Sequence, residues 1–478
     1  MDRRTFGPAD TVQYIWTTLG LPKDALESLN LPTEAEYCPS SFKVGHLAQA
    51  SIALSALSAA LVWSAHHEKP VPSVTVSAKH ACAEFKSERL YVLNGKAAPS
   101  TFGTIGGLHK TRDGHIRMHD GFRNHREIAL RVLGLREGAT REDVAQKMLQ
   151  WNSIDLETKA IREGAVMAAL RSFQEWDALP QSRAVADLPI LLDKIADGTR
   201  DSTNSSQSTQ ATKCLQGIRV VEMSRVIAAP VAGKTLAAHG ADVVWITSPS
   251  LPDLPDVDID VSRGKRTVQL DIKRPTDKKE LLELLRTADV FIQGYRPGSL
   301  AAQGLSNKDL VELNPNLIIA SLSAYGPDGP WSQRRGFDSL VQTCSGINVA
   351  DAERYGSSET AMVLPCQALD HGSGYLLATG VIAALYKRTT EGGAYEVRVS
   401  LAGVMRYLRS LGQYEGKSGF DRRDIKGPEE AGDFLETRLT EFGELKAVKH
   451  AAHIDGVEVG WVHMPKPLGR DNPVWLPR

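Results

Sequence analysis

Strands and helices alternate along the second half of this 478-residue sequence, and this alternation restricts the possible folds more than any other feature. Runs of apolar and β-branched residues predict strands at 217–223, 242–246, 266–272, 289–293 and 317–322. Segments with helical periodicity lie between them, at 230–239, 275–288 and 307–313. Such alternation favours a parallel sheet covered by helices on both faces. The sequence therefore predicts an α/β fold whose large domain is a doubly wound, Rossmann-like parallel sheet.

A polar segment divides the chain. Residues 197–212 are rich in serine and threonine and hold no large apolar side chain, so we interpret them as a flexible linker. Before it, residues 86–196 are predicted to form a smaller α+β domain, and residues 1–85 a helical segment that completes the large domain. After it, residues 213–410 are assigned to the large domain and residues 411–478 to a C-terminal extension.

Composition disfavours several classes of partner. The formal net charge is −1, whereas a protein that binds nucleic acid or an acidic membrane surface usually carries a basic excess. The five cysteines lack CxxC and metal-like histidine spacing, which indicates reduced thiols and no metal site. Residues 44–63 are apolar, but polar side chains interrupt them, so we expect a buried helix rather than a membrane span. No signal core begins the sequence, so we expect a cytoplasmic location and leave a mitochondrial one open.

One carboxylate stands at the start of a long apolar segment. Asp370 precedes Gly372, Ser373 and Gly374, and residues 375–386 have the periodicity of a buried helix. An ordinary helix N-cap is one interpretation of this aspartate. The small residues of the first turn favour another, in which they leave open space for a ligand beside the carboxylate. In both cases the helix dipole and free backbone N–H groups are expected to hold the carboxylate ionised.

Cationic residues follow several of the predicted strands. Because ligands of doubly wound sheets bind at the carboxyl ends of the strands, these loops are candidate binding elements. They contain Arg225, Arg263, Lys265, Arg266 and Arg296, which could converge on one face and bind phosphates. Each loop taken alone is also consistent with a solvated turn. The first strand lacks a following GxGxxG and the chain lacks a Walker A sequence, which disfavours an NAD-type or P-loop site.

Eight motifs occur in a fixed order in this part of the chain. They are Gly217-Ile-Arg-Val-Val-Glu-Met-Ser-Arg-Val, Gly240-Ala-Asp-Val-Val, Arg263-Gly-Lys-Arg-Thr-Val-Gln-Leu-Asp-Ile, Ala288-Asp-Val-Phe-Ile, Arg296-Pro-Gly, Leu313-Asn-Pro-Asn-Leu-Ile, Ser323-Ala-Tyr-Gly-Pro-Asp-Gly-Pro and Asp370-x-x-x-Gly374. With these motifs, residues 215–405 resemble the class III coenzyme A transferases. That superfamily includes formyl-CoA transferase, carnitine CoA-transferases and α-methylacyl-CoA racemase.

The resemblance implies an enzyme that moves coenzyme A (CoA) from an acyl-CoA thioester to a small carboxylic acid, without a prosthetic group. Asp370 is implied to be the nucleophile, through acyl-aspartyl anhydride and aspartyl-CoA intermediates. The residues implied to bind CoA or border its site are Arg225, Val226, Ile227, Ala228, Arg263, Lys265, Arg266, Tyr295, Arg296 and Tyr325. The glycines implied to lie at the nucleophile are Gly103, Gly106 and Gly107 of a small-domain loop, and Gly374. The interlocked homodimers of the family imply the same assembly here.

His371 and Phe337 bear on the type of reaction. His371 is adjacent to Asp370, but neighbouring helix residues diverge by about a hundred degrees, so we expect a structural or gating role for it. Phe337 stands where the racemase branch has a histidine. Because racemisation requires proton transfer on both faces of the α-carbon, this phenylalanine favours the transferase over the racemase. A non-catalytic scaffold that binds CoA or a partner remains the alternative.

The chain also departs from the family pattern. The usual Gly-Gly-Asp-x-x-Arg stretch after the second strand is replaced here by residues 247–252, Thr-Ser-Pro-Ser-Leu-Pro. Residues 86–195 resemble the small domain that normally follows the large one. The chain is therefore either circularly permuted, which is tolerated where termini lie close together, or carries a remnant of a second copy.

Overall fold

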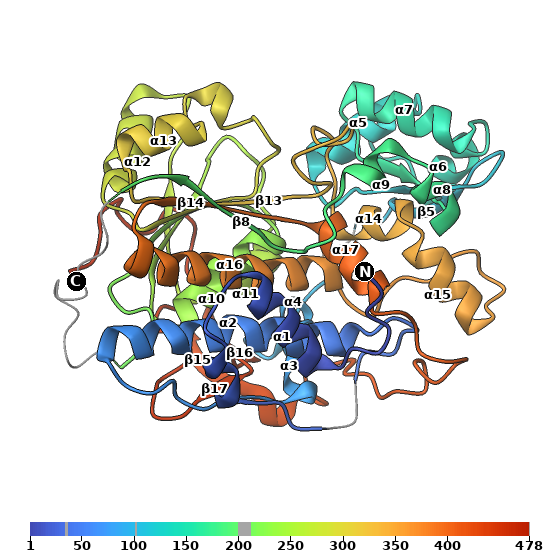
Figure 1. Ribbon diagram of the computed structural model, residues 1–478. Coiled ribbons are helices and arrows are strands. Elements are labelled where there is room, and N and C mark those ends of the chain that lie inside the picture. The colour runs from blue at the N-terminus through green and yellow to red at the C-terminus, as the bar shows by residue number, and fades with distance from the viewer. Residues whose placement is uncertain (34–36, 101–102, 199–211, 478) are drawn as a thin grey trace.

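The computed structural model describes residues 1–33, 37–100, 103–198 and 212–477. Most of the predicted linker 197–212 lies outside the described residues, as do Thr101 and Phe102 of the predicted glycine loop. A large sheet with helices on both faces lies beside a smaller unit that the chain forms between residues 107 and 177 (Figure 1).

A seven-stranded sheet forms the centre of the larger part. In spatial order its strands are β11 (Lys265–Gln269), β10 (Asp242–Thr247), β9 (Arg219–Met223), β12 (Val290–Gln293), β13 (Ile318–Ser323), β14 (Ala394–Ser400) and β8 (Leu191–Ala196). The first six are parallel to their neighbours, and β8 pairs antiparallel with β14. The predicted parallel sheet is thus confirmed, with two strands that the sequence pattern does not predict. Strand order reverses between β9 and β12, the kind of position at which open α/β sheets bind ligands.

Helices cover both faces of this sheet. On one face, α10 (Ala228–Ala238) and α16 (Ala368–Glu391) share a core with α2 (Val44–His67). On the other, α12 (Pro275–Arg286) and α13 (Asn307–Leu313) bury leucines. Within the described residues, α2 alone is long and apolar enough to cross a membrane, but 89% of its most apolar window is buried inside the protein. The buried helix expected at 44–63 is therefore present.

The smaller unit combines strands and helices around a core of its own. Its antiparallel sheet consists of β5 (Gly107–Lys110), β6 (His115–Met118) and β7 (Met167–Ala169). The helices α5 (Arg123–Val132), α6 (Arg141–Met148) and α7 (Ser153–Glu163) contribute to that core.

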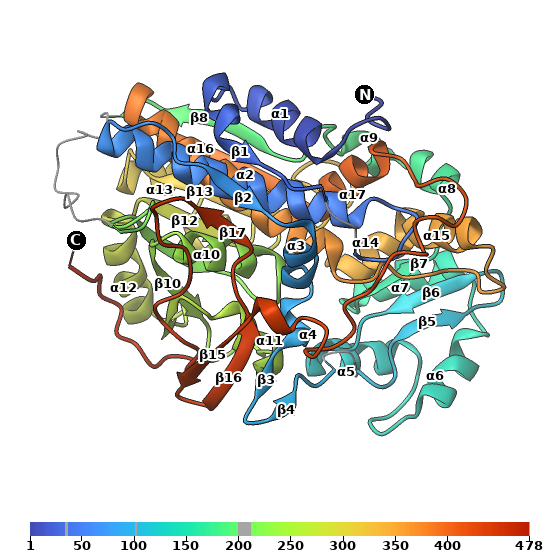
Figure 2. The ribbon, with the colours of Figure 1, turned by 90° about the horizontal axis from the view of Figure 1, so that it is seen from below.

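The C-terminal residues are built into two small sheets with N-terminal strands (Figure 2). One contains β15 (Leu435–Thr440), β16 (Gly443–Val448), β3 (Val92–Leu93) and β4 (Lys96–Ala97), and the other β17 (Ala452–Ile454), β2 (Val74–Val76) and β1 (Leu29–Asn30). Further helices are α1 (Pro8–Thr18), α3 (Ala78–Glu84), α4 (Ser87–Leu90), α8 (Phe173–Asp177), α9 (Pro180–Ala184), α11 (Pro255–Val261), α14 (Asp338–Cys344), α15 (Ile347–Tyr355) and α17 (Leu401–Ser410), with short 3-10 turns at Lys23–Ser28, Ala301–Gln303 and Gly432–Phe434. The two ends of the chain therefore depend on each other for their strand pairing.

Close packing around the first turns of α16 depends on its glycines. A Cβ atom at Gly374 would lie 2.6 Å from the carbonyl oxygen of Ala228 and 2.6 Å from Val231 Cβ, both on α10. A Cβ atom at Gly372 would lie 3.1 Å from Leu47 of α2. The expectation that these glycines leave open space for a ligand is wrong, because they let neighbouring helices approach α16.

Replacing Gly374 by alanine is expected to lower the free energy of unfolding by about 1–3 kcal/mol, because an overpacked core forces its neighbours apart. Urea denaturation followed by circular dichroism measures the change. Gly432 offers a control, since an added Cβ there meets nothing within 4 Å. Gly432→Ala should stay within about 0.5 kcal/mol of the wild type. Equal stability of the two variants would contradict the packing argument.

Candidate active site

Asp370 lies in the first turn of α16, but a different carboxylate caps this helix. The N-cap residue is Gln367, whose side chain makes no capping hydrogen bond. The backbone N–H groups of Leu369 and Asp370 donate to Asp338 Oδ2 at 2.8 and 2.9 Å. Asp338 begins α14 and also accepts a hydrogen bond from Gln342 Nε2. The N-cap interpretation of Asp370 is therefore wrong, and its own carboxylate receives no hydrogen bond from the described residues.

Burial, rather than the helix dipole, decides the charge of Asp370. The residue is only 7% exposed. Burial raises the pKa of its carboxyl well above the usual value, and the nearby carboxyl groups of Asp338 and Glu88 raise this pKa further. Burial also raises the pKa of Asp338, to about 6. The expectation that backbone N–H groups hold Asp370 ionised is wrong, because those groups bind Asp338 instead.

The raised pKa of Asp370 predicts a pH-dependent stability. Between the pKa of an unfolded aspartate, about 3.9, and the raised pKa of the folded protein, the native state holds a proton that the unfolded chain has lost. The contribution of Asp370 to the free energy of unfolding therefore falls as pH rises through this window. Asp370→Asn removes this ionisation, so its stability relative to the wild type should grow as pH rises above about 4. Urea denaturation of both proteins across pH tests this, and parallel profiles would contradict it.

Asp370 forms part of the wall of a cavity of ≈ 500 Å³ at the carboxyl ends of the large sheet. Residues that follow β9, β10, β11, β12 and β14 line it, including part of the segment 247–252 that departs from the family pattern. Six predicted binding residues also line it, namely Arg225, Val226, Ile227, Ala228, Tyr295 and Arg296. Val226 has φ of 74°, a left-handed conformation that is costly for a β-branched residue. Such strain persists only where the surrounding structure holds the backbone, and it is common at binding turns.

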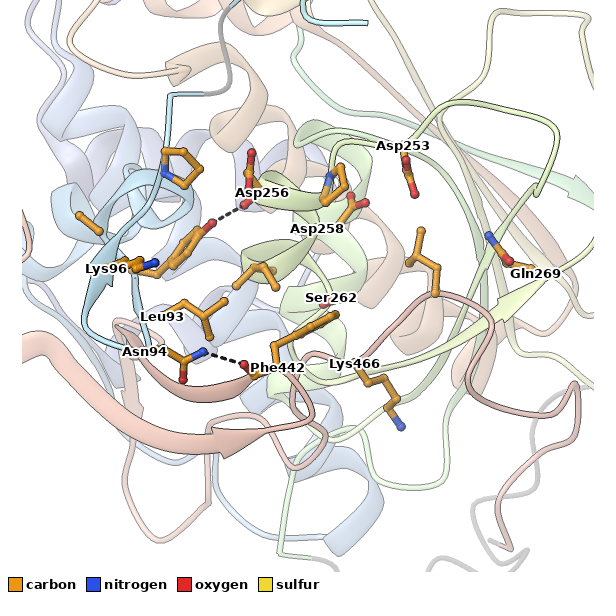
Figure 3. A pocket seen from close by; sticks show the side chains of 16 residues that line it. Leu93, Asn94, Lys96, Asp253, Asp256, Asp258, Ser262, Gln269, Phe442 and Lys466 are labelled. Carbon is orange, nitrogen blue, oxygen red and sulfur yellow. Dashed lines mark hydrogen bonds between the residues drawn. The ribbon is translucent and has the colours of Figure 1, made fainter. Parts of the chain in front are cut away.

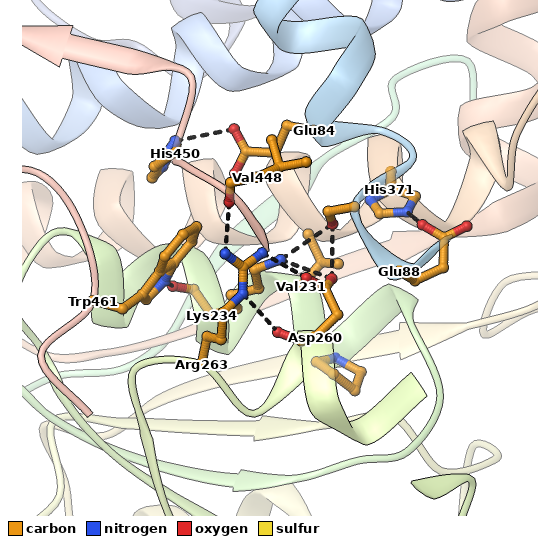
Figure 4. Close-up of polar contacts among 12 residues, drawn as sticks. Glu84, Glu88, Val231, Lys234, Asp260, Arg263, His371, Val448, His450 and Trp461 are labelled. Carbon is orange, nitrogen blue, oxygen red and sulfur yellow. Dashed lines mark hydrogen bonds and ion pairs between the residues drawn. The ribbon is translucent and has the colours of Figure 1, made fainter. Parts of the chain in front are cut away.

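Arg263, another predicted binding residue, belongs to a buried polar cluster instead. Figure 4 shows its guanidinium between Asp260, the carbonyl oxygen of Val448 and the ring of Trp461. Lys234 Nζ also binds Asp260, at 2.8 Å. Arg263 is 1% exposed and does not line the cavity. The cluster joins the large sheet to the C-terminal residues.

Three more predicted binding residues also lie outside the cavity that contains Asp370. Lys265 Nζ pairs with Glu222 at 2.9 Å, and Arg266 binds both carboxylate oxygens of Asp242 at 2.8 Å. Tyr325 is buried, with its ring 5.3 Å from that of Trp331. None of the three lines the cavity. The predicted convergence of all five cations on one face is therefore wrong, because three of them serve internal ion pairs.

The predicted glycine loop folds around a carboxylate of its own unit. The N–H groups of Ile105 and Gly106 donate to Asp120 Oδ2 at 3.0 and 2.8 Å. A Cβ atom at Gly103 or at Gly106 would lie 2.1 Å from the Asp120 carboxylate, and Gly107 has φ of 90°. These glycines are required for the turn, and none of them lines the cavity that contains Asp370.

Several cavity residues carry no motif that the sequence interpretation could use. The smaller unit contributes Phe122, Asn124 and His125, and the loop before α14 contributes Arg335. Phe337, which the sequence analysis compared with the racemase histidine, also lines the cavity. A short run of histidine and aromatic residues at 119–125 was the available signal. This run indicates a functional site only once the fold is known, because the fold places the smaller unit against the strand ends.

His371, next to the candidate nucleophile, lies outside the cavity. Its Nε2 atom lies 2.9 Å from Glu88 Oε2 (Figure 4). Its ring stacks on that of Phe85. The residue is fully buried. These contacts agree with the structural role expected for His371.

A second cavity, of ≈ 730 Å³, lies among the β3–β4 hairpin, α11 and the C-terminal residues (Figure 3). Asp253, Asp256 and Asp258 are among its lining residues. Burial, followed by the charge of Asp253, raises the pKa of Asp258 to about 7. No residue that the sequence predicts to be functional lines this cavity. In the part of the chain that the structure describes, no group of three or more histidine, cysteine or acidic residues is arranged to hold a metal ion.

Residues 215–429 match the sequence profile of CoA-transferase family III. This segment, called the family III segment below, is similar to that family and makes up a little less than half of the chain. The family III segment contains Asp370 and most of the residues that line its cavity.

Relatives of known name match the family III segment in part. A probable fatty acyl-CoA transferase of Mycobacterium tuberculosis, Rv3272, is 34% identical over 210 residues, which cover 41% of this chain and 52% of that protein. A formyl-CoA:oxalate CoA-transferase of Rhodopseudomonas palustris is 33% identical over 211 residues, 41% of this chain and 49% of that protein. A crystal structure of Rv3272 aligns with a TM-score of 0.36 at 32% identity and covers 42% of this chain and 58% of that one. The chain spans about half the length of the curated relatives that it matches.

Proposed function

We propose that the protein transfers CoA from an acyl-CoA thioester to a carboxylic acid, with Asp370 as nucleophile. Ionised Asp370 attacks the thioester carbonyl, the C–S bond breaks, and CoA leaves as a thiolate while an acyl-aspartyl anhydride forms. The thiolate attacks the aspartyl carbonyl and releases the donor acid, which leaves aspartyl-CoA. The acceptor carboxylate displaces the thiolate to form a second anhydride. The thiolate then attacks the acceptor carbonyl, which restores Asp370 and releases the new thioester.

The proposal depends on the position, burial and raised pKa of the Asp370 carboxyl group. It lies in the cavity wall, it is buried, and no described residue donates a hydrogen bond to it. Its raised pKa makes the ionised form a stronger base and nucleophile than an exposed carboxylate. Arg225 and Arg296 line the same cavity and suit the phosphates of a CoA thioester. The similarity of residues 215–429 to CoA-transferase family III supports the same chemistry.

Trapping the covalent intermediate tests the proposal. Incubation with an acyl-CoA in the absence of acceptor acid should leave CoA attached to the peptide that contains Asp370. Mass spectrometry of a digest locates the adduct, and hydroxylamine should cleave it. A panel of acyl-CoA donors identifies the acyl group. An adduct on a different peptide would contradict the assignment, and CoA binding without any adduct would favour the non-catalytic scaffold.

We further propose that the protein works as a homodimer, as the resemblance to the family implies. Light scattering at micromolar concentration should give twice the mass of one chain. A stable monomer with transfer activity would contradict this assembly.

A further inference from the structure

A histidine of the smaller unit faces the cavity that contains Asp370. His125 lies in the first turn of α5 and lines this cavity together with Asp370. The residue is 7% exposed. No hydrogen bond reaches either of its ring nitrogens from the described residues, and Nδ1 is fully buried. Nε2 is not among the buried unpaired atoms, so it keeps accessible surface and is the nitrogen that a molecule in the cavity can reach.

Aromatic neighbours fix the ring of His125 without using its nitrogens. The ring centroid lies 5.3 Å from that of Phe122 and 5.8 Å from that of Phe337, at interplanar angles of 77° and 61°. His119 also packs edge-on to it, at 6.0 Å, and stacks on Phe337 at 3.9 Å. Such edge-to-face packing sets the orientation of a ring. Residues from both units therefore hold His125 in place before any substrate binds.

The charge state of His125 determines which groups it can bind. Burial, together with smaller effects of the charges of His119, Arg335 and Arg225, lowers its pKa to about 3. The imidazole is therefore neutral at neutral pH, with one N–H donor and one acceptor nitrogen. A thioester carbonyl or a carboxylate offers only acceptor oxygens, so the N–H group of His125 matches either of them.

We infer that His125 is a second catalytic residue that donates a hydrogen bond to an oxygen of the acyl group reacting at Asp370. This inference rests on the proposed function. The oxygen belongs either to the thioester carbonyl of the donor or to the carboxylate of the acceptor acid. A fixed donor at this place orients the carbonyl carbon and stabilises the oxyanion that forms on attack.

Two substitutions test the inference. His125→Phe keeps an aromatic ring for packing but removes both nitrogens, whereas His125→Asn restores an N–H donor. We expect His125→Phe to lower kcat for transfer by about 10²–10³-fold, the effect of removing one oxyanion donor. KM for acyl-CoA should change less, and His125→Asn should recover at least about tenfold in kcat. His115→Phe is the control, because His115 lies on β6 of the same unit and does not line the cavity.

The rate of adduct formation on Asp370 separates failure of this inference from failure of the proposed function. If the wild type forms the adduct and His125→Phe forms it at the same rate, the inference is overturned while the proposed function stands. If the wild type forms no adduct, the proposed function fails, and the inference fails with it. Should His125→Phe not fold, His125→Leu takes its place. Equal rates for the leucine and asparagine variants would then overturn the inference.

Discussion

Asp370→Asn is expected to fold like the wild type and to lose CoA transfer by at least about 10³-fold, the scale on which loss of a covalent nucleophile acts. The amide has nearly the size of the carboxyl but is a far poorer nucleophile. The helix start stays intact, because Asp338 accepts the hydrogen bonds from the first turn of α16. Steady-state assays with an acyl-CoA donor and an acid acceptor measure the loss, and circular dichroism checks the fold.

A buried aspartate outside the cavity provides the control for this substitution. Asp351 accepts hydrogen bonds from Ser40 and Ser41, and burial raises its pKa as it raises that of Asp370. Asp351→Asn removes a buried carboxyl in the same way and should keep transfer activity. Normal turnover by Asp370→Asn would place the nucleophile elsewhere and overturn the central assignment.

Lys265→Met is expected to lower the free energy of unfolding by about 3–5 kcal/mol, because it leaves a buried charge without its partner. Glu222 is fully buried, and Lys265 is the cation that pairs with it at 2.9 Å. Urea denaturation measures the loss. The double variant Lys265→Met/Glu222→Gln removes both charges and should recover much of the stability.

The same variants separate an internal role of Lys265 from the CoA-binding role that the family resemblance implied. If Lys265 serves only its ion pair, the double variant should show the wild-type KM for acyl-CoA. A raised KM for acyl-CoA in the double variant, with stability restored, would show that Lys265 takes part in CoA binding. The position of Lys265 outside the cavity lining favours the first outcome.

Much of the fold follows from local sequence patterns. The strands predicted at 217–223, 242–246 and 289–293 correspond to β9, β10 and β12, because apolar periodicity reports strands within a few residues. β8 and β14 could not be predicted in the same way. β8 belongs to the part of the chain before residues 199–211, and it completes the sheet by pairing with a strand about two hundred residues further along. Pairing at that distance leaves no local signal.

In the candidate site, too, residues with a local sequence signal could be predicted and residues placed by distant contacts could not. Asp370 could be located from its place before an apolar helix and from the order of the motifs. The carboxylate of Asp338, which caps that helix from 31 positions earlier in the chain, could not. Neither could His125, because only the contact between the two units brings it to the cavity.

The sequence by itself determined the parallel sheet, the helix that carries Asp370 and the resemblance to the family, because these depend on periodicity and on the order of motifs. Only the tertiary structure decided the charge of Asp370 and the roles of the basic residues. A pKa depends on the burial of the group and on the charges around it. A buried cation pairs with whichever carboxylate the fold brings within reach. Asp260, Glu222 and Asp242 lie within reach of Arg263, Lys265 and Arg266, respectively, so these cations stabilise the fold instead of lining the cavity.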